Sequence, residues 1–486
     1  MSEELRYGSA AGRWVLVATV LGSGIAALDA TVVGIALPAI GEDFGADVAS
    51  LQWVVTAYTL TLAGLLLLGG TLGDKYGRRR VFSIGVVWFA LASVLCGVAP
   101  SSEVLILARA LQGIGAALLT PGSLAILQAS FRSDDRSKAI GAWSGLGGLA
   151  TAIGPFLGGW LITAVSWRLV FFINVPLAVA VVAIAARHVP ESRDATTGPV
   201  DRTGATAVTA GLVGLTYGLI EGPSRGWSSA VVVASLVAGV VLLALFVVIE
   251  RTSDHPMLPL SVFRSRQFSA ANGVTFIVYA ALGGVLFLLP VVLQVVAGYS
   301  PLLAGSALLP VTAIMLGLSA RSGALATRIG PRLQMTVGPV VIAAGLALLL
   351  RVEPDADYVT QVLPAMLVFG LGLAINVAPL TSTVLAAAPA EHAGVASAIN
   401  NDVARTGGLI AVAVLPVLAG ITGETFGHPS ALLAGFHSAV VIASVACVLG
   451  GILAWITIRN PALPVAPSEG VRHCALEAAP LVVSGR

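Results

Sequence analysis

The sequence has little charge and little cysteine. Charged residues make up 10% of its 486 residues, against roughly 25% in soluble proteins, whereas hydrophobic residues make up 57%. The net charge of +2 supplies no strongly basic face, so we expect no nucleic-acid partner. The three cysteines are spaced for neither a zinc site nor a disulfide framework, and we expect no metal.

Two kinds of functional motif are also missing. The chain has no Gly-x-x-x-x-Gly-Lys-Ser/Thr phosphate-binding loop, so energy from ATP is not expected. Its apolar runs contain no set of nucleophile, metal-ligand or redox residues such as a membrane-embedded enzyme would need. We therefore expect neither an enzyme nor a cofactor, and a proton gradient is the energy source we favour.

Long apolar runs cover most of the chain. A helix needs about 20 mainly apolar residues to cross the roughly 30 Å hydrocarbon layer of a bilayer. The first run, 14–40, is too long for a signal-peptide core and contains Asp29, so we interpret it as a retained membrane helix. The sequence predicts an all-α integral membrane fold with 14 transmembrane helices, at about 14–40, 49–72, 81–99, 103–128, 137–163, 168–187, 204–221, 229–249, 268–297, 301–320, 334–351, 360–385, 395–420 and 435–458. Because 204–221 is short and rich in glycine, twelve spans plus a re-entrant segment is the alternative.

Lysine and arginine gather at one end of the predicted helices. Arg168, Arg225 and Arg351 lie on one side and two arginines lie within spans, whereas the rest of the 26 lysines and arginines lie on the other side. Since short cytoplasmic loops retain positive charge, this pattern places both termini in the cytoplasm. We expect a multi-pass protein of the cell (plasma) membrane.

Two loops have related sequences. Gly70-Thr-Leu-Gly-Asp74-Lys-Tyr-Gly77-Arg-Arg79 follows the second predicted helix, and Gly323-Ala-Leu-Ala-Thr327-Arg-Ile-Gly330-Pro-Arg332 follows the tenth. Their shared glycines, leucine, cation and arginine at identical spacing indicate two parallel halves with a helix pair inserted between them. We predict an N-terminal six-helix bundle at 1–190, two inserted helices at 204–249, a C-terminal six-helix bundle at 265–460 and a cytoplasmic tail at 461–486.

The first loop resembles the signature of the major facilitator superfamily, Gly-x-Leu-x-Asp-x-x-Gly-Arg-Arg or Lys, which Gly70 through Arg79 match. In the first span, Leu28-Asp29-Ala-Thr31-Val-Val-Gly34-Ile-Ala-Leu37-Pro38 is similar to a motif of the fourteen-helix drug:proton antiporter branch, which usually has Asn at the place of Gly34. The resemblance implies a major facilitator fold of two six-helix bundles plus two inserted helices. It also implies proton-coupled export of small organic molecules, namely drugs or antibiotics, by alternating access.

Two further spans carry the resemblance. In the fourth, Arg109-Ala-Leu-Gln112-Gly-Ile-Gly resembles the motif that places a cation within the N-terminal bundle, where the family's arginine is implicated in proton relay. The fifth span is similar to the glycine-proline motif of exporters, through Gly145, Gly148, Gly154, Pro155, Gly158 and Gly159. A flexible interface that seals one side of the pathway and ordinary tight helix packing are both open for these glycines.

Asp29 and Arg109 are our candidates for proton coupling. A charge at the centre of a span costs about 2.5–3.5 kcal/mol on insertion scales, so Asp29 should face protein or a water-filled cavity. A nearby cation and the opening of that cavity can both change its proton affinity. Arg109 cannot readily lose its own proton, which suits it to modulate an acid. The alternatives are that Asp29 only bonds across helices and that Arg109 is a fixed clamp.

The loop with Gly70, Asp74, Gly77, Arg78 and Arg79 is our candidate conformational switch. In the family, its acid and arginines form a charge network that stabilises one access state. Cations that only retain the loop inside are the alternative.

Other polar residues of the spans are candidates for a substrate or proton path. Gln112 shares a face with Arg109, Glu221 lies at an outer helix end, and Asp402 and Arg405 are close enough on one helix to pair with each other. The expected partners are a small-molecule substrate, protons and the lipid bilayer, and the expected state is a monomer. An exporter of a native metabolite, peptide or siderophore is the alternative function, and a non-transporting receptor or scaffold is the alternative from another class.

Overall fold

The computed structural model describes residues 5–194, 198–388, 393–423 and 428–460. In this part of the chain, 14 helical segments are long and apolar enough to cross a membrane. The helices of the N-terminal half and the inserted pair are α1 (Ala10–Phe44), α2 (Val48–Tyr76), α3 (Arg78–Gly97), α4 (Ser102–Ser130), α5 (Ser133–Ala164), α6 (Leu169–Phe172), α7 (Asn174–His188), α8 (Arg202–Arg225) and α9 (Ala230–Thr252). Those of the C-terminal half are α10 (Arg266–Val295), α11 (Pro301–Ser306), α12 (Leu309–Ile329), α13 (Pro331–Leu348), α14 (Leu363–Ala386), α15 (Ala393–Leu418) and α17 (Pro429–Thr457). The predicted tail at 461–486, with Cys474, lies outside the described residues.

Three spans are interrupted, which the sequence analysis did not predict. The sixth consists of α6 and α7, and the tenth of α11 and α12, with Pro310 in the first turn of the second piece. The twelfth opens with a π-helical turn, η3 (Tyr358–Val362), before α14. Short 3₁₀ turns, η1 (Leu260–Arg264) and η2 (Leu349–Arg351), precede α10 and follow α13. Hydropathy averaged over about 18 residues does not reveal such breaks, because each span as a whole is apolar.

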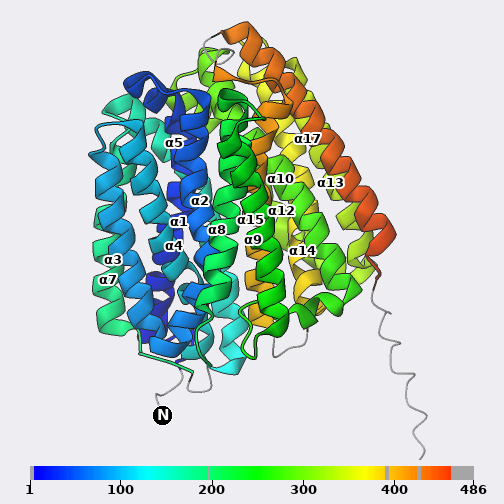
Figure 1. Ribbon diagram of the computed structural model, residues 1–486. Coiled ribbons are helices and arrows are strands. Elements are labelled where there is room, and N and C mark those ends of the chain that lie inside the picture. The colour runs from blue at the N-terminus through cyan, green and yellow to red at the C-terminus, as the bar shows by residue number, and fades with distance from the viewer. Residues whose placement is uncertain (1–4, 195–197, 389–392, 424–427, 461–486) are drawn as a thin grey trace, which may run out of the picture.

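The helices lie side by side in two groups with a hairpin between them. In Figure 1 the N-terminal group is blue to cyan, the C-terminal group is yellow-green to red, and the green helices α8 and α9 lie between them. Helix α8 contacts α2 of the first group and α15 of the second. The inserted hairpin therefore touches both groups along one side.

Close glycine contacts join α8 to α9. A Cβ on Gly214 would lie 2.8 Å from the Ser235 carbonyl oxygen, and one on Gly239 would lie 2.5 Å from the Leu215 amide nitrogen. Small residues allow two membrane helices to approach until their backbones touch. The glycine content of 204–221 thus reflects packing, and α8, with 24 residues, is a full helix of about 36 Å and not a re-entrant segment.

The two related loops have the same local structure. Gly77 and Gly330 have φ of +110° and +82°, which glycine adopts without the steric cost that a Cβ brings. Glu191, after α7, accepts hydrogen bonds from the amides of Arg79 and Arg80 at 3.1 and 3.2 Å. Asn460, after α17, accepts one from the amide of Arg332 at 3.0 Å. In each half, therefore, the residue that follows the last helix caps the helix after the loop, as two parallel repeats require.

Candidate functional site

Asp29 lies in the middle of α1 and is fully buried. Its Oδ1 accepts hydrogen bonds from Gln112 Nε2 at 2.8 Å and from Asn174 Nδ2 at 2.9 Å. Its Oδ2 accepts a hydrogen bond from Arg109 Nη1, which is also an ion pair. Three donors thus surround one carboxylate, an arrangement that suits the ionised acid.

Arg109 is held on every side. Its Nε donates to the Val54 carbonyl oxygen of α2 at 3.1 Å, and its Nη1 also donates to Gln112 Oε1. The guanidinium carbon lies 4.3 Å from the centre of the Tyr58 ring, a cation–π contact. These contacts orient the planar guanidinium towards Asp29 and leave it 1% exposed.

Two residues of this cluster were missed by the sequence analysis. Ser93 of α3 accepts hydrogen bonds from Gln112 Nε2 at 2.8 Å and from Asn174 Nδ2 at 3.3 Å. Asn174 is the first residue of α7, directly after the break in the sixth span. The sequence did contain a signal for Asn174, which is an asparagine within a strongly apolar run. A side-chain amide buried at membrane depth needs hydrogen-bond partners, so such a residue indicates a polar cluster.

A proton on Asp29 would disturb the contacts of this cluster. Asp29, Arg109, Gln112, Asn174 and Ser93 come from four helices, α1, α3, α4 and α7. Protonation of Asp29 would remove the negative charge that Arg109 faces, so a buried cation would lose its partner. Protonation of this acid and the relative positions of these helices are therefore energetically linked.

Side chains of the candidate switch loop also have partners within the N-terminal bundle. Arg78 Nη2 lies 2.7 Å from Asp74 Oδ1, and Arg79 Nη1 donates to the Val189 carbonyl oxygen at 3.1 Å. A Cβ on Gly77 would lie 2.8 Å from the carboxyl group of Glu191. Glu191 is the residue that the sequence analysis missed here, because nothing in its spacing links it to a loop more than a hundred residues away.

The glycine-proline motif of α5 is divided between two environments. A Cβ on Gly145 or Gly148 would have no atom within 4 Å. In contrast, a Cβ on Gly158 would lie 2.6 Å from Val32 of α1, and one on Gly159 would lie 2.4 Å from the Pro301 carbonyl oxygen of α11. Gly154 and Pro155 also lie in this tightly packed part, against Thr31 and Gly305 respectively. The close contacts of this motif are therefore restricted to the C-terminal half of α5, and they fit both a sealing interface and ordinary tight packing.

Other contacts between the two bundles lie near the end of the molecule that contains the C-terminal half of α5. Gln52 Nε2 of α2 donates to the Val412 carbonyl oxygen of α15 at 2.6 Å. Gln294 Nε2 of α10 donates to the Ile35 carbonyl oxygen of α1 at 3.1 Å. The bundles are thus joined near the loops that follow α1 and α5, whereas most side chains in the N-terminal half of α5 are exposed or half-buried.

The remaining candidates do not join the Asp29 cluster. Glu221 accepts hydrogen bonds from Trp53 Nε1 at 3.1 Å and from Arg225 Nε at 2.9 Å at the far end of α8. Asp402 and Arg405 form no ion pair with each other in the described part of the chain, so that expectation was wrong. Asp402 Oδ1 and Arg405 Nε are each buried without a hydrogen-bond partner, since a spacing of three residues places two side chains on one helix face but does not by itself join their charged ends.

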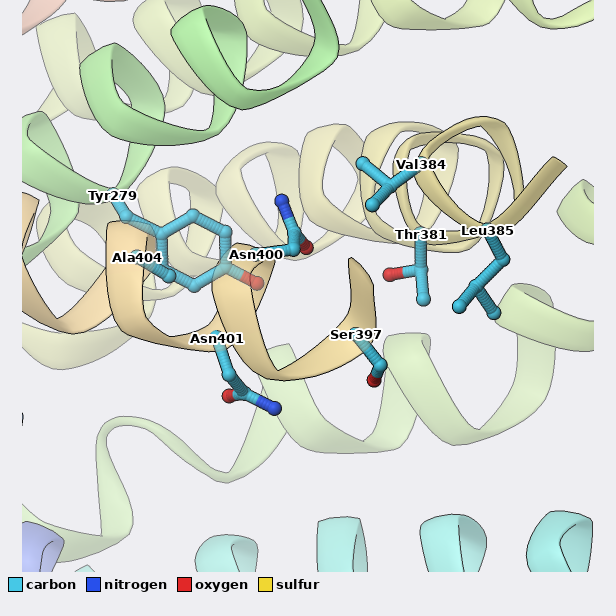
Figure 2. A pocket seen from close by; sticks show the side chains of 8 residues that line it. All are labelled: Tyr279, Thr381, Val384, Leu385, Ser397, Asn400, Asn401 and Ala404. Atoms are coloured by element: carbon cyan, nitrogen blue, oxygen red, sulfur yellow. The ribbon is translucent and has the colours of Figure 1, made fainter. Parts of the chain in front are cut away.

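The C-terminal bundle contains a cavity of about 120 Å³. Figure 2 shows its lining: Tyr279 of α10, Thr381, Val384 and Leu385 of α14, and Ser397, Asn400, Asn401 and Ala404 of α15. Asn400 Nδ2 donates to Asn272 Oδ1 at 3.1 Å and to Thr275 Oγ1 at 2.8 Å. The sequence analysis overlooked the Asn400-Asn401 pair as a polar signal within a span.

Comparisons with known proteins agree on one family. A sequence model of the Major Facilitator Superfamily matches residues 19–413. The puromycin resistance protein pur8 of Streptomyces alboniger is 37% identical over 468 residues, with 92% of this chain and 91% of that protein covered. The methylenomycin A resistance protein of Bacillus subtilis is 34% identical over 451 residues, 92% of this chain and 95% of that protein. The multidrug resistance protein Stp of Mycobacterium tuberculosis is 37% identical over 401 residues, 82% of this chain and 74% of that protein.

Solved structures share the fold. A crystal structure of the peptide transporter POT in complex with sulfate has a TM-score of 0.67 at 14% identity, covering 94% of this chain and 98% of its own. A bacterial homologue of the human lysosomal transporter Spinster, in an inward-facing and unoccupied conformation, has a TM-score of 0.66 at 16% identity, covering 94% and 100%. The predicted all-α membrane fold is confirmed by these similarities and by the 14 spans of the described residues.

Proposed function

We propose a proton-coupled export function for this chain, which belongs to the Major Facilitator Superfamily and is related over most of its length to drug and antibiotic resistance exporters. Membership of this transporter family also confirms that the chain is not an enzyme. The observation that carries the proposal is the buried ion pair of Asp29 and Arg109 in the N-terminal bundle. A buried carboxylate that can bind a proton only when its helices rearrange is what coupling requires.

The proposed cycle has two access states. The bundles are joined near the loops after α1 and α5, and the N-terminal half of α5 is open. With both termini in the cytoplasm, this is the inward-facing state, in which substrate enters between the bundles. Proton binding to Asp29 from the opposite side would weaken its hold on Arg109 and favour the return from the other state. Asp74 and Arg78 would stabilise one of the two states from the switch loop.

The proposed substrates are small organic molecules of the drug or antibiotic class. The polar cavity beside Asn400 is the candidate contact site for them in the C-terminal bundle. A native metabolite, peptide or siderophore is the alternative cargo, and it would use the same cycle. We also propose a location in the cell membrane, cytoplasmic termini and a monomeric state.

Transport by the purified protein tests this function. Proteoliposomes that contain the purified protein, with an imposed proton gradient, are offered a panel of antibiotics that begins with puromycin and methylenomycin A. We expect accumulation of at least one compound, and its loss when the gradient is collapsed. Accumulation that is unaffected by the collapse would contradict proton coupling, and no transport of any compound would favour a receptor or scaffold.

A further inference from the structure

Two acidic residues meet at one end of the inserted hairpin. Asp201 precedes α8, and its Oδ1 accepts a hydrogen bond from the Gly204 amide at 2.8 Å. Glu250 lies in the last turn of α9 and is 3% exposed. Its Oε2 accepts a hydrogen bond from the Leu258 amide at 2.9 Å. One oxygen of each carboxyl group is thus engaged by the backbone.

The other two oxygens lie beside the same glycine, Gly204. Asp201 Oδ2 and Glu250 Oε1 are both buried, and neither has a donor from another group. They would lie 2.5 and 2.8 Å from a Cβ on Gly204, so both converge on the space that this glycine leaves free. Because an ionised carboxylate can only accept, two such oxygens can share a hydrogen bond only if one of them carries a proton.

Charged side chains on the neighbouring elements do not neutralise the pair. No ion pair involves Asp201 or Glu250 in the part of the chain that the structure describes. Lys75 of α2 approaches the Gly198 carbonyl oxygen at 3.5 Å, and Asp402 of α15 lies across a crevice that Leu258 also lines. The other charged or titratable residues beside the pair point to the surface: Arg202, Arg251, Asp254 and His255.

We propose that Asp201 and Glu250 share one bound proton and form a proton-binding site separate from Asp29. Two carboxylates placed this close together repel each other unless one is neutral. The shared proton converts this repulsion into a hydrogen bond that ties the start of α8 to the end of α9. Glu250 also accepts a hydrogen bond from the amide of Leu258. The shared proton therefore stabilises the position of the connector between the hairpin and the C-terminal bundle. Loss of the proton releases that connector.

Difference infrared spectroscopy of the purified full-length protein tests the shared proton directly. Subtraction of the Glu250→Gln spectrum from that of the parent should leave the carbonyl band of a protonated carboxyl group. Asp201→Asn, which keeps the oxygen that caps α8, should remove the same band. Glu191→Gln is the control, because Glu191 accepts N–H donors from Arg79 and Arg80 and should contribute no such band. A parent spectrum indistinguishable from those of both variants in this region would overturn the proposal.

Hydrogen exchange of the segment around Leu258 tests the consequence. After correction for the intrinsic effect of pH, exchange in the parent should accelerate as the pH rises and the shared proton is lost. Glu250→Gln carries a permanently neutral side chain and should remove this acceleration. The same pH profile in parent and variant would contradict the proposal. Neither measurement involves transport, so their outcome is independent of the proposed export function.

Discussion

Asp29 and Arg109 lie where neither could remain charged without the other. Removing one partner of a buried ion pair costs about 3–5 kcal/mol, because the remaining charge is left without compensation. Gln112 contacts both members, donating to Asp29 Oδ1 and accepting from Arg109 Nη1. At the scale of single residues, a change in the protonation of Asp29 would therefore alter the hydrogen bonds of both Arg109 and Gln112.

Arg109→Lys tests the need for the planar guanidinium. Lysine keeps the charge but cannot contact Asp29, Gln112 and the Val54 carbonyl oxygen together. Loss of one charge-assisted hydrogen bond, at about 1.5–3 kcal/mol, corresponds to a roughly ten- to hundredfold lower rate of gradient-driven transport. Arg225→Lys is the matched control, because Arg225 is half exposed and pairs with Glu221 away from the cluster. Equal transport rates in the two variants would show that Arg109 supplies charge alone.

At the scale of single helices, glycines at a few positions determine where a helix begins and how closely it packs. At the start of α3, Gly77 combines a φ of +110° with a Cβ position 2.8 Å from the carboxyl group of Glu191. In α5, the same residue type is packed at Gly159 and free at Gly148. The role of a glycine is thus decided by its surroundings and not by the motif to which it belongs.

Gly77→Ala should destabilise the protein. The positive φ alone costs a residue with a Cβ about 1–2 kcal/mol, and displacement of Glu191 would uncap α3. The measurement is the thermal midpoint of unfolding in detergent. Gly141→Ala is the control, since its Cβ would meet no atom within 4 Å and alanine favours a helix by about 0.5–1 kcal/mol. A midpoint for Gly77→Ala equal to that of Gly141→Ala would contradict the proposed role of this turn.

Gly159→Ala should shift the balance between access states. Its Cβ would overlap the Pro301 carbonyl oxygen, so the joined end of the bundles must separate, whereas Gly148→Ala adds a methyl group to open space. The measurement is the labelling rate of a cysteine at Ser144, an exposed position on α5, in a background without the native cysteines. We expect slower labelling with Gly159→Ala and parent-like labelling with Gly148→Ala. Faster or unchanged labelling with Gly159→Ala would refute the sealing role of this contact.

For the whole molecule, the distribution of lysine and arginine predicts that both termini are cytoplasmic. A reporter fused to the N-terminus should be inaccessible from outside intact cells. One inserted beside Pro429, at the start of α17, should be accessible. The opposite pattern would reverse the proposed orientation and, with it, the direction of the access state described above.

The sequence predicted the helices and the repeat well because each depends on a regular pattern. Apolar runs gave the spans, and Asp29, Arg109 and Gln112 were recognisable as polar residues within them. Contacts between distant segments could not be predicted in this way. Asn174 and Glu191 acquire their partners only when α7 packs beside α1 and α3. Asp402 and Arg405 show the converse, since a favourable spacing along one helix did not produce a pair.

Substrate-induced proton release tests the central claim most directly. The purified parent protein in weakly buffered detergent solution receives a transported compound, and the pH change is compared with that of Asp29→Asn, whose side chain keeps the size but cannot exchange a proton. If Asp29 is the coupling acid, the parent should release protons, and Asp29→Asn should release fewer while still binding the compound. Release of the same number of protons by both proteins would contradict the account, and the coupling acid would then have to be sought among Glu221, Asp402 and Asp74.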